Sequence, residues 1–374
     1  MKIVCISASF VPSETANSIQ MMKAVHALAQ LGHDVTLLVP ENPRKISNGD
    51  WLSYYGLSTS FEIEQLRSAS RRRFFWDAVR RAASLRPDII YTWVPQSAVY
   101  ALIHRMPVII ELHDLPSGSV GPWWYRLFLW IPGCKRMLVI TRALRDTFEN
   151  KYGKSLAPED VILAPNGIEP ERFENLPSPQ EARRQLGLVE APTVACTGHL
   201  YAGRGVELFV ELAKAVPDAQ FLWAGGTPED VTAWKGRSAH LRNLTFTGFI
   251  SNDRLPLYQA AADILLMPYA RVIGISSGGG NSAAISSPLK MFEYLAAGRA
   301  IVASELPVFH EVLDERNAVF CLPEDVPGWT AAVRALLGDP ARREGLGRQA
   351  KIDSQQYSWT ERAKRALSGF LDKR

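Results

Sequence analysis

The sequence is poor in cysteine, and its cysteines are not arranged for metal binding or cross-linking. Among 374 residues there are four, which lie far apart and form no Cys-x-x-Cys pair: Cys5, Cys134, Cys196 and Cys321. Zinc sites and disulfide frameworks need clustered or paired cysteines, so neither is expected to organise this chain. The scattered thiols favour a reducing compartment.

Long apolar runs are also missing. No uninterrupted run approaches the roughly 20 residues that a membrane-spanning helix needs. The chain begins with Met1-Lys-Ile-Val-Cys-Ile6, which has the pattern of a strand and not of a cleavable signal peptide. We therefore expect a cytoplasmic protein that at most lies peripherally on the inner face of the cytoplasmic membrane.

Two further absences exclude classes of function. The sequence has no Gly-x-Gly-x-x-Gly fingerprint, so an NAD-type oxidoreductase is disfavoured. The formal net charge is only +4, and no groove-reading module accompanies the basic residues. Nucleic acid is therefore not expected as a partner.

Short apolar runs alternate with helical segments in two successive series. The first series starts at Lys2-Ile-Val-Cys-Ile6, and the second starts at Thr193-Val-Ala-Cys-Thr197, after a segment rich in proline and charge. Such alternation is typical of parallel α/β proteins. The predicted fold is α/β, with two Rossmann-like doubly wound domains facing across a cleft. The expected domains are 1–168 and 193–357, with a linker at 169–192 and a C-terminal helix at 358–374 that packs back on the first domain.

The stretch 286–304 combines a phosphate-binding pattern with an isolated carboxylate. The serine before Pro288 is a natural N-cap, and Pro288 fits the first turn of a helix. The backbone N–H groups of Leu289 and Lys290 would then face an anion at the positive end of the helix dipole. Glu293 lies on an otherwise apolar segment and needs a partner, for which a pair of sugar hydroxyls is suitable. The alternative is an ordinary helix with a solvent-facing glutamate.

Basic side chains follow two of the predicted strands, at the sheet edge where doubly wound folds bind ligands. His113 follows the apolar run 107–112 and stands beside Asp114. Arg204 precedes a glycine, and with His199 it is predicted to flank a phosphate. The alternatives are a structural histidine and a solvated loop arginine.

Arginines and aromatic residues are interleaved in two segments of the N-terminal half. Such clusters bind anionic lipid headgroups from the membrane surface. The alternative is a solvated helix face whose aromatic rings pack inward. The candidates for membrane contact are Arg71, Arg72, Arg73 and Trp76 in the first segment, and Trp123 and Trp124 in the second.

Several motifs occur in a fixed order along almost the whole chain. They are Leu31-Gly-His-Asp-Val-Thr, His113-Asp114, Pro165-Asn-Gly-Ile168, Gly198-x5-Arg204-Gly205, Gly225-Gly226, Gly248 and Ser287-Pro-Leu-Lys-Met-Phe-Glu-Tyr with Gly298. Their order and spacing resemble the family-4 retaining glycosyltransferases, which are glycosyl transferases of group 1 with the GT-B fold.

The resemblance implies an N-terminal domain that binds the acceptor and a C-terminal domain that binds a nucleotide-diphosphate sugar. It implies that Glu293 binds the ribose hydroxyls and that Arg204 binds the diphosphate together with the N–H groups at the helix start. His113 would meet the transferred sugar, and the backbone at 248–250 would contact the base. The catalytic candidates are thus His113, Arg204 and Glu293, and the donor-binding candidates are His199, Gly248, Phe249, Ser286, Ser287, Leu289, Lys290 and Glu293.

The sequence departs from the family pattern at three places. Many members carry a second glutamate upstream of the first, and Ile285 stands at that position here. The segment 276–287 supplies serines, glycines and Asn281 instead. His199 stands where a second basic residue often sits, and Asn17 and Ser18, the acceptor-loop candidates, stand where a glycine pair is frequent. These departures leave the identity of the sugar open.

The resulting expectation is a retaining transferase that moves a sugar from a nucleotide-diphosphate sugar to a lipid-linked or polysaccharide acceptor in cell-envelope glycan synthesis. No Asp-x-Asp motif occurs, so no metal or other cofactor is expected. The alternatives are a transferase with a soluble acceptor, a GT-B sugar-nucleotide epimerase, and a non-catalytic partner subunit that binds a nucleotide sugar.

Overall fold

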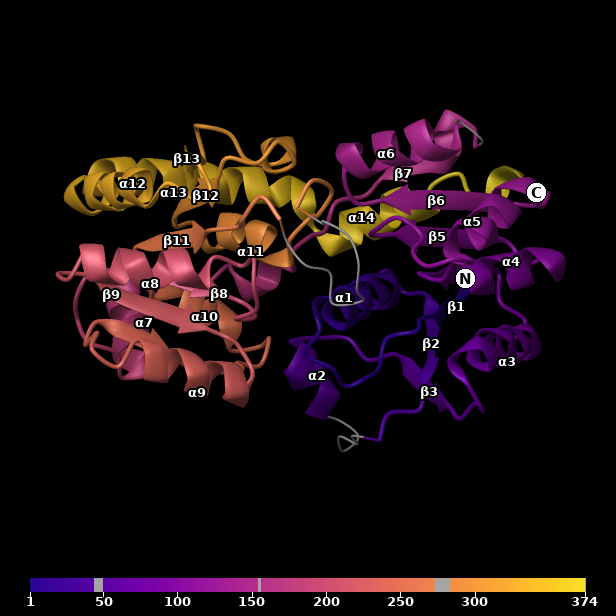
Figure 1. The fold of residues 1–374 in the computed structure, drawn as a ribbon. Coiled ribbons are helices and arrows are strands. Elements are labelled where there is room, and N and C mark those ends of the chain that lie inside the picture. The colour runs from indigo at the N-terminus through magenta and orange to yellow at the C-terminus, as the bar shows by residue number, and fades with distance from the viewer. Residues whose placement is uncertain (44–49, 154–155, 273–282, 374) are drawn as a thin grey trace. The chain divides into compact units, whose positions relative to one another are not determined.

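The computed structural model describes residues 1–43, 50–153, 156–272 and 283–373. The chain forms two compact units, Met1–Asn166 with Trp359–Arg374, and Gly167–Ser358. Each unit is an α/β fold built on one parallel sheet (Figure 1). The predicted class of two Rossmann-like doubly wound domains is therefore confirmed.

The first unit has a seven-stranded sheet in the order β3-β2-β1-β4-β5-β6-β7, counted over its described residues. β4 and β5 are buried along their whole length, which is why they read as continuous apolar runs in the sequence. The strands are β1 (Lys2–Ile6), β2 (Asp34–Pro40), β3 (Glu62–Leu66), β4 (Ile89–Thr92), β5 (Val108–Leu112), β6 (Lys135–Val139) and β7 (Val161–Leu163). The helices are α1 (Ala16–Gln30), α2 (Asp50–Tyr55), α3 (Arg71–Ser84), α4 (Pro95–Ile103), α5 (Gly121–Trp130), α6 (Arg142–Tyr152) and α14 (Trp359–Leu367).

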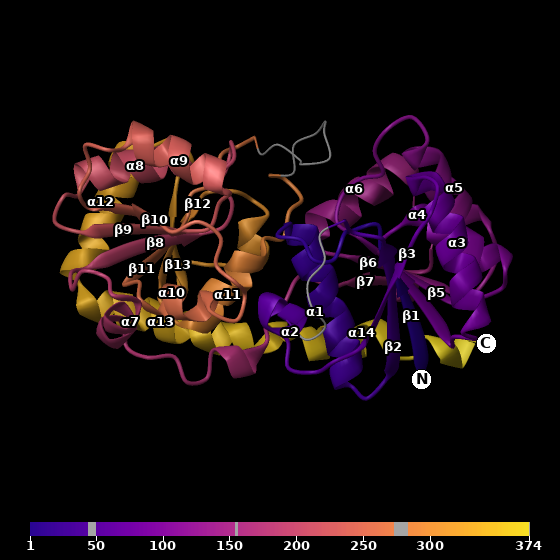
Figure 2. The same cartoon turned by 90° about the horizontal axis from the view of Figure 1, so that it is seen from below.

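The second unit has a six-stranded sheet in the order β10-β9-β8-β11-β12-β13 over the residues described, and helices lie on both of its faces (Figure 2). The strands are β8 (Thr193–Thr197), β9 (Gln220–Ala224), β10 (Leu244–Phe246), β11 (Ile264–Met267), β12 (Ala300–Ser304) and β13 (Ala318–Cys321). The helices are α7 (Pro179–Leu186), α8 (Val206–Ala215), α9 (Pro228–Arg237), α10 (Leu255–Ala260), α11 (Leu289–Ala297), α12 (Val326–Gly338) and α13 (Pro340–Ser354).

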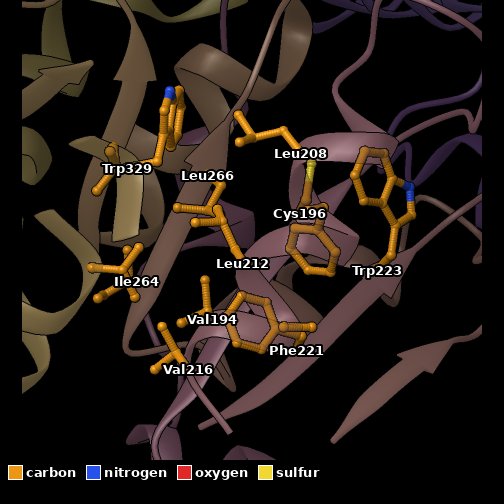
Figure 3. Close-up of a cluster of buried hydrophobic side chains, with 14 of the residues drawn as sticks. Val194, Cys196, Leu208, Leu212, Val216, Phe221, Trp223, Ile264, Leu266 and Trp329 are labelled. Atoms are coloured by element: carbon orange, nitrogen blue, oxygen red, sulfur yellow. The ribbon is translucent and has the colours of Figure 1, made fainter. Parts of the chain in front are cut away.

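One face of the second sheet is sealed by a large apolar cluster. Side chains of β8, β9 and β11 meet those of α8 and α12, and Cys196 and Trp223 belong to the cluster (Figure 3). Both side chains are fully buried. The carboxyl ends of β8 and β9 are therefore held in a rigid frame, which matters for the groups placed just beyond them.

The segment 169–192, expected as a linker, is part of the second unit. Its helix α7 buries Ala182 against Ala260 and Ala261. Arg183 forms an ion pair with Asp263, with 2.9 Å between Nη1 and Oδ2. Pro179, one of the prolines that suggested a linker, instead begins a helix capped by Ser178, and Arg183 anchors that helix to the rest of the unit.

The two ends of the chain contribute neighbouring helices to the first unit. α1 starts at Ala16, because the Thr15 side chain accepts a hydrogen bond from the Ser18 N–H and caps the helix. At the other end of the chain, α14 packs against α1 in the first unit. Its residues join the fold of the N-terminal strands although they lie far away in sequence.

Candidate functional site

The second sheet changes winding direction between β8 and β11, which are neighbours in the sheet but not in the sequence. Open α/β sheets bind ligands beyond the carboxyl ends of the strands at such a switch point. Three segments meet the criterion here: the loop after β8, the residues after β11, and the start of α11. They carry Arg204, Tyr269 and Lys290.

Arg204 is held by two tyrosines. Its Nη1 donates to the Tyr269 hydroxyl at 2.8 Å, and its Nη2 donates to the Tyr201 hydroxyl at 2.9 Å. Its guanidinium carbon also lies 5.0 Å from the centroid of each ring, a cation–π distance. The Nε atom is buried and has no hydrogen-bond partner among the described atoms. The guanidinium is therefore fixed in place, and its Nε–H group can still donate a hydrogen bond.

Lys290 supplies a second cation beside the first. Its side chain is 8% exposed, and Nζ lies 5.3 Å from the Tyr269 ring centroid, 5.8 Å from that of Trp223 and 3.6 Å from Cys196 Sγ. From the sequence we expected only the backbone N–H of this residue at the site, and we did not predict a role for its side chain. The available signal was a charged residue on the buried, otherwise apolar face of a helix.

Neither cation has a carboxylate partner among the residues that the structure describes. Burying an ammonium or guanidinium group without an anion is costly. Two such groups beside the Tyr269 ring have the chemistry that suits an anion with more than one charged oxygen.

The start of α11 differs by one step from the prediction. Pro288 is itself the N-cap, and no side chain accepts a hydrogen bond from the first turn. The Ser286 hydroxyl is buried and unpartnered among the described residues. Ser287 and Ile285 are buried. Because the N–H groups of Leu289 and Lys290 follow this uncapped start, an anion can still be bound there.

Glu293 has a partner that the sequence did not suggest. The buried Gln259 of α10 donates from Nε2 to Glu293 Oε2 at 2.9 Å. Glu293 is half-buried, so one carboxylate oxygen is fixed by the amide and the other remains able to accept hydrogen bonds from hydroxyl groups.

The other donor-binding candidates lie around the same strand ends. His199 follows β8 and stacks on Tyr201, with 5.6 Å between ring centroids. Gly248 has a positive φ of 79° and forms a bridge with Gly225, and Phe249 follows it, half-buried. This region presents backbone groups at the ends of β9 and β10, and nothing in the structure identifies a base.

Gly205 brings the loop that carries Arg204 close to β11. Its φ is 81°, and a Cβ atom there would lie 1.8 Å from the Pro268 carbonyl oxygen. We expect Gly205→Ala to destabilise the protein by roughly 3 kcal/mol or more, from clash and backbone strain together. Chemical denaturation measures the change in the free energy of unfolding.

A matched control is Gly236→Ala in α9, where the added Cβ meets nothing within 4 Å. This substitution should stabilise the protein by about 0.5–1 kcal/mol. Equal stabilities for the two variants would contradict this view of the loop.

His113 lies at the carboxyl end of β5 in the first unit. Its Nε2 is 2.6 Å from Oε1 of Glu111, a carboxylate that is 1% exposed. Arg362 of α14 binds Glu111 through both terminal nitrogens, at 3.1 and 2.6 Å. Burial alone would raise the pKa of Glu111, but Arg362 and His113 outweigh it and hold that pKa well below its usual range. Neither Glu111 nor Arg362 was recognised from the sequence, although a glutamate inside an apolar strand was a visible signal.

The two acceptor-loop candidates have different surroundings. Asn17 is exposed. Ser18 is fully buried, and its hydroxyl binds the Phe10 carbonyl at 3.0 Å and the Tyr55 hydroxyl at 2.8 Å. Ser18 therefore stabilises the start of α1, which begins before this residue and turns its side chain inward. Its role in binding the acceptor stays a prediction.

The candidate residues for membrane contact differ in their exposure to solvent. Arg71, Arg72 and Arg73 are exposed at the start of α3. Trp76 packs on Tyr100 and His104, and Trp124 packs on Tyr100, so these two rings serve the fold. Trp123 is 55% exposed, and Trp130, which we did not single out, is 80% exposed.

Part of the segment expected to replace the missing glutamate lies outside the residues that the structure describes. This part is 276–282, which includes Asn281. Within residues 1–43, 50–153, 156–272 and 283–373, no group of three or more His, Cys, Asp or Glu side chains is placed to hold a metal ion. Over the same residues, no helix combines the length and apolarity required to cross a bilayer.

Two family models match the chain in succession. The model "Glycosyltransferase Family 4" matches residues 19–172, and "Glycosyl transferases group 1" matches residues 191–339. The chain belongs to this glycosyltransferase family. The first model covers β2 to β7 of the first unit, and the second covers β8 to β13 of the second unit, so the family assignment and the two-unit fold agree.

Characterised relatives and solved structures extend this assignment. A GDP-mannose-dependent alpha-(1-6)-phosphatidylinositol monomannoside mannosyltransferase of Mycolicibacterium smegmatis is 29% identical over 230 residues, 58% of either chain. The chain thus spans little more than half of that relative. A phosphatidyl-myo-inositol mannosyltransferase of the same organism is 24% identical over 96% of this chain and 90% of its own. The structure of Anabaena HepE in complex with UDP-glucose superposes over both full chains with a TM-score of 0.76 at 16% identity, which shows a shared GT-B fold.

Proposed function

We propose that this protein transfers a sugar from a nucleotide-diphosphate sugar to a lipid-linked or polysaccharide acceptor, with retention of configuration, in cell-envelope glycan synthesis. The observation that carries the proposal is a pair of neighbouring cations, the half-buried Arg204 and the buried Lys290, with no carboxylate partner among the described residues. A diphosphate supplies the negative charge that these two cations lack, and its several oxygens allow it to contact both of them.

The remaining groups of the second unit fit the rest of the donor. Glu293, fixed by Gln259, has a free carboxylate oxygen for the two hydroxyls of a ribose. The N–H groups at the start of α11 and the unpartnered Ser286 hydroxyl add neutral donors beside the cations. With two fixed cations present, we propose that departure of the diphosphate needs no metal ion.

The proposed chemistry is a front-face displacement. The bond between the anomeric carbon and the diphosphate oxygen breaks as the acceptor oxygen bonds to the same face of that carbon. The acceptor proton passes to the departing diphosphate. Arg204 and Lys290 stabilise the negative charge that develops on the leaving group, which is where preorganised charges lower a barrier most. We assign His113 a contact with the transferred sugar.

The names of the relatives support a lipid acceptor. Both mannosyltransferases are named for phosphatidylinositol-based acceptors. In this chain α5 carries Trp123, Arg126 and Trp130 at positions i, i+3 and i+7, which share one helix face, and all three are exposed. We propose that this face contacts an anionic membrane surface.

The donor assignment predicts the effect of two substitutions. Glu293→Ala and Arg204→Ala should each lower release of nucleoside diphosphate by about 100-fold or more, because each removes a contact that positions or stabilises the leaving group. The measurement is a coupled assay of nucleoside diphosphate release, run with wild-type protein and a panel of nucleotide sugars and acceptors. Unchanged turnover in both variants would contradict the proposal, and donor binding without any transfer would favour the non-catalytic subunit.

The membrane assignment makes a separate prediction. Trp123→Ala combined with Trp130→Ala should reduce flotation with vesicles containing phosphatidylglycerol several-fold, because the two rings supply the apolar contact. Ile352→Ala, which truncates a residue 59% exposed in the second unit, serves as the control and should float as wild type does. Absence of wild-type flotation would favour a soluble acceptor.

A further inference from the structure

Glu111 is a buried charge with an unusual number of partners. It lies in the middle of the first sheet on β5 and is 1% exposed. Gln20 of α1 donates to Oε1, the Tyr91 hydroxyl donates to Oε2, and Arg362 of α14 binds both oxygens. Three donors from three different elements already satisfy this carboxylate before His113 is considered.

Arg362 reaches Glu111 from a distant part of the chain. It is 2% exposed, and its Nε also donates to the carbonyl oxygens of Ala164 and Pro165, at 3.2 and 2.9 Å. Its planar guanidinium is therefore locked at one edge by the backbone after β7 and at the other edge by the carboxylate. A bidentate pair of this kind fixes the carboxylate plane as well as its charge.

The fixed carboxylate in turn determines the state of His113. An ionised carboxylate only accepts hydrogen bonds, so the 2.6 Å contact requires the proton to be on His113 Nε2. In the neutral imidazole this leaves Nδ1, the other ring nitrogen, without a proton and able to accept a hydrogen bond. The side chain is 21% exposed, so the far edge of the ring remains open to a ligand.

We propose that Glu111 and Arg362 are positioning residues for His113. The C-terminal helix α14, which carries Arg362, then helps to orient the His113 side chain. The inference rests on the proposed function, in which His113 contacts the transferred sugar. Displacement of α14 would release the carboxylate, and with it the orientation of the imidazole ring.

The first unit offers a matched control for this role. Arg136 on β6 also holds the C-terminal segment, because its Nη1 donates to the carbonyl oxygens of Ala366 and Ser368, each at 2.8 Å. Like Arg362 it is buried, but among the described residues its hydrogen bonds reach the C-terminal segment and not Glu111 or His113. Arg136→Lys therefore weakens the hydrogen bonds at the end of α14, while Arg362 keeps its own bonds to Glu111 and to the carbonyl oxygens of Ala164 and Pro165.

The test is a double-mutant cycle on the full-length protein. Arg362→Lys should lower kcat about tenfold or more while the KM for the nucleotide sugar changes little, since only one nitrogen then meets the carboxylate. In a His113→Ala background the same substitution should have almost no further effect, because it acts through the lost ring. Arg136→Lys should lower the melting temperature to a similar extent but leave kcat near wild type. Multiplicative losses in the cycle, or an equal fall of kcat in Arg136→Lys, would overturn the inference.

A second readout does not depend on transfer activity. Long-range ¹⁵N NMR of the imidazole nitrogens should show His113 in wild type with its proton on Nε2, and a mixture of tautomers or a shifted signal in Arg362→Lys and Glu111→Gln. Identical His113 signals in wild type and both variants would overturn the positioning role even if transfer is confirmed. If no transfer is found but the tautomer responds as expected, the proposed function fails and the network remains.

Discussion

Replacing Lys290 by methionine should remove nearly all transfer activity while leaving the protein at least as stable as wild type. We expect kcat to fall by about 100-fold or more, since a buried cation beside a developing diphosphate charge contributes several kcal/mol to lowering the barrier. Arg204 alone cannot replace it. The residual activity reflects binding of the donor by the remaining groups.

The expected stability of this variant follows from the surroundings of the side chain. Lys290 Nζ lies against Cys196 and the rings of Trp223 and Tyr269, and it has no carboxylate partner among the described residues. Methionine fills a similar volume and suits aromatic neighbours. Removal of an unpaired buried charge should therefore raise the melting temperature by about 2–4 °C.

Circular dichroism melts and a nucleoside diphosphate release assay measure the two effects together. Lys214→Met on α8, which removes an exposed lysine paired with Glu211 at 2.7 Å, is the matched control and should change neither value appreciably. A large loss of stability in Lys290→Met would mean that the ammonium serves the fold, and the anion site would then lose its main support.

Replacing Arg362 by methionine should have the opposite signature, a large loss of stability. Glu111 would be left as an unpaired buried carboxylate, which typically costs about 3–5 kcal/mol. Replacing both residues, Glu111→Leu with Arg362→Met, should recover most of that loss, because two apolar side chains need no ionic partner. Urea denaturation measures the free energy of unfolding for the three proteins.

The same pair predicts a pH dependence with a definite sign. The pKa of Glu111 is held below its ordinary value of 4.5 in the folded protein. A lowered pKa contributes stability that is present above the unfolded value and is lost as the pH falls below it. Unfolding free energy should therefore drop more steeply below about pH 4.5 in wild type than in the double variant. Parallel pH profiles would contradict a charged Glu111 in the folded state.

The fold could be predicted from the sequence because its signals are local. Buried parallel strands such as Ile89–Thr92 and Val108–Leu112 are short apolar runs, and each is followed by a helical period or a turn. Segments whose composition fits both a loop and a helix were harder to predict. Proline and charge in 169–192 suggested a linker, whereas the tertiary contacts of Ala182 and Arg183 decide that α7 is packed.

The site was only half visible in the sequence. Arg204 and Glu293 stand in motifs whose chemistry can be inferred from neighbouring residues. Arg362 could not be found that way, since it meets Glu111 across 251 positions of sequence, and no local pattern encodes that contact. The role of Gln259 beside Glu293 depends likewise on the packing of α10 against α11.

Binding of a nucleoside diphosphate to the second unit through Arg204 and Lys290 can be tested directly by isothermal titration calorimetry. The full-length protein is titrated with UDP, GDP, ADP and dTDP. We expect one of these nucleotides to bind with one-to-one stoichiometry, and Arg204→Met and Lys290→Met each to weaken that binding by about tenfold or more. Absence of binding by all four nucleotides, or equal binding by wild type and both variants, would contradict the proposed diphosphate site.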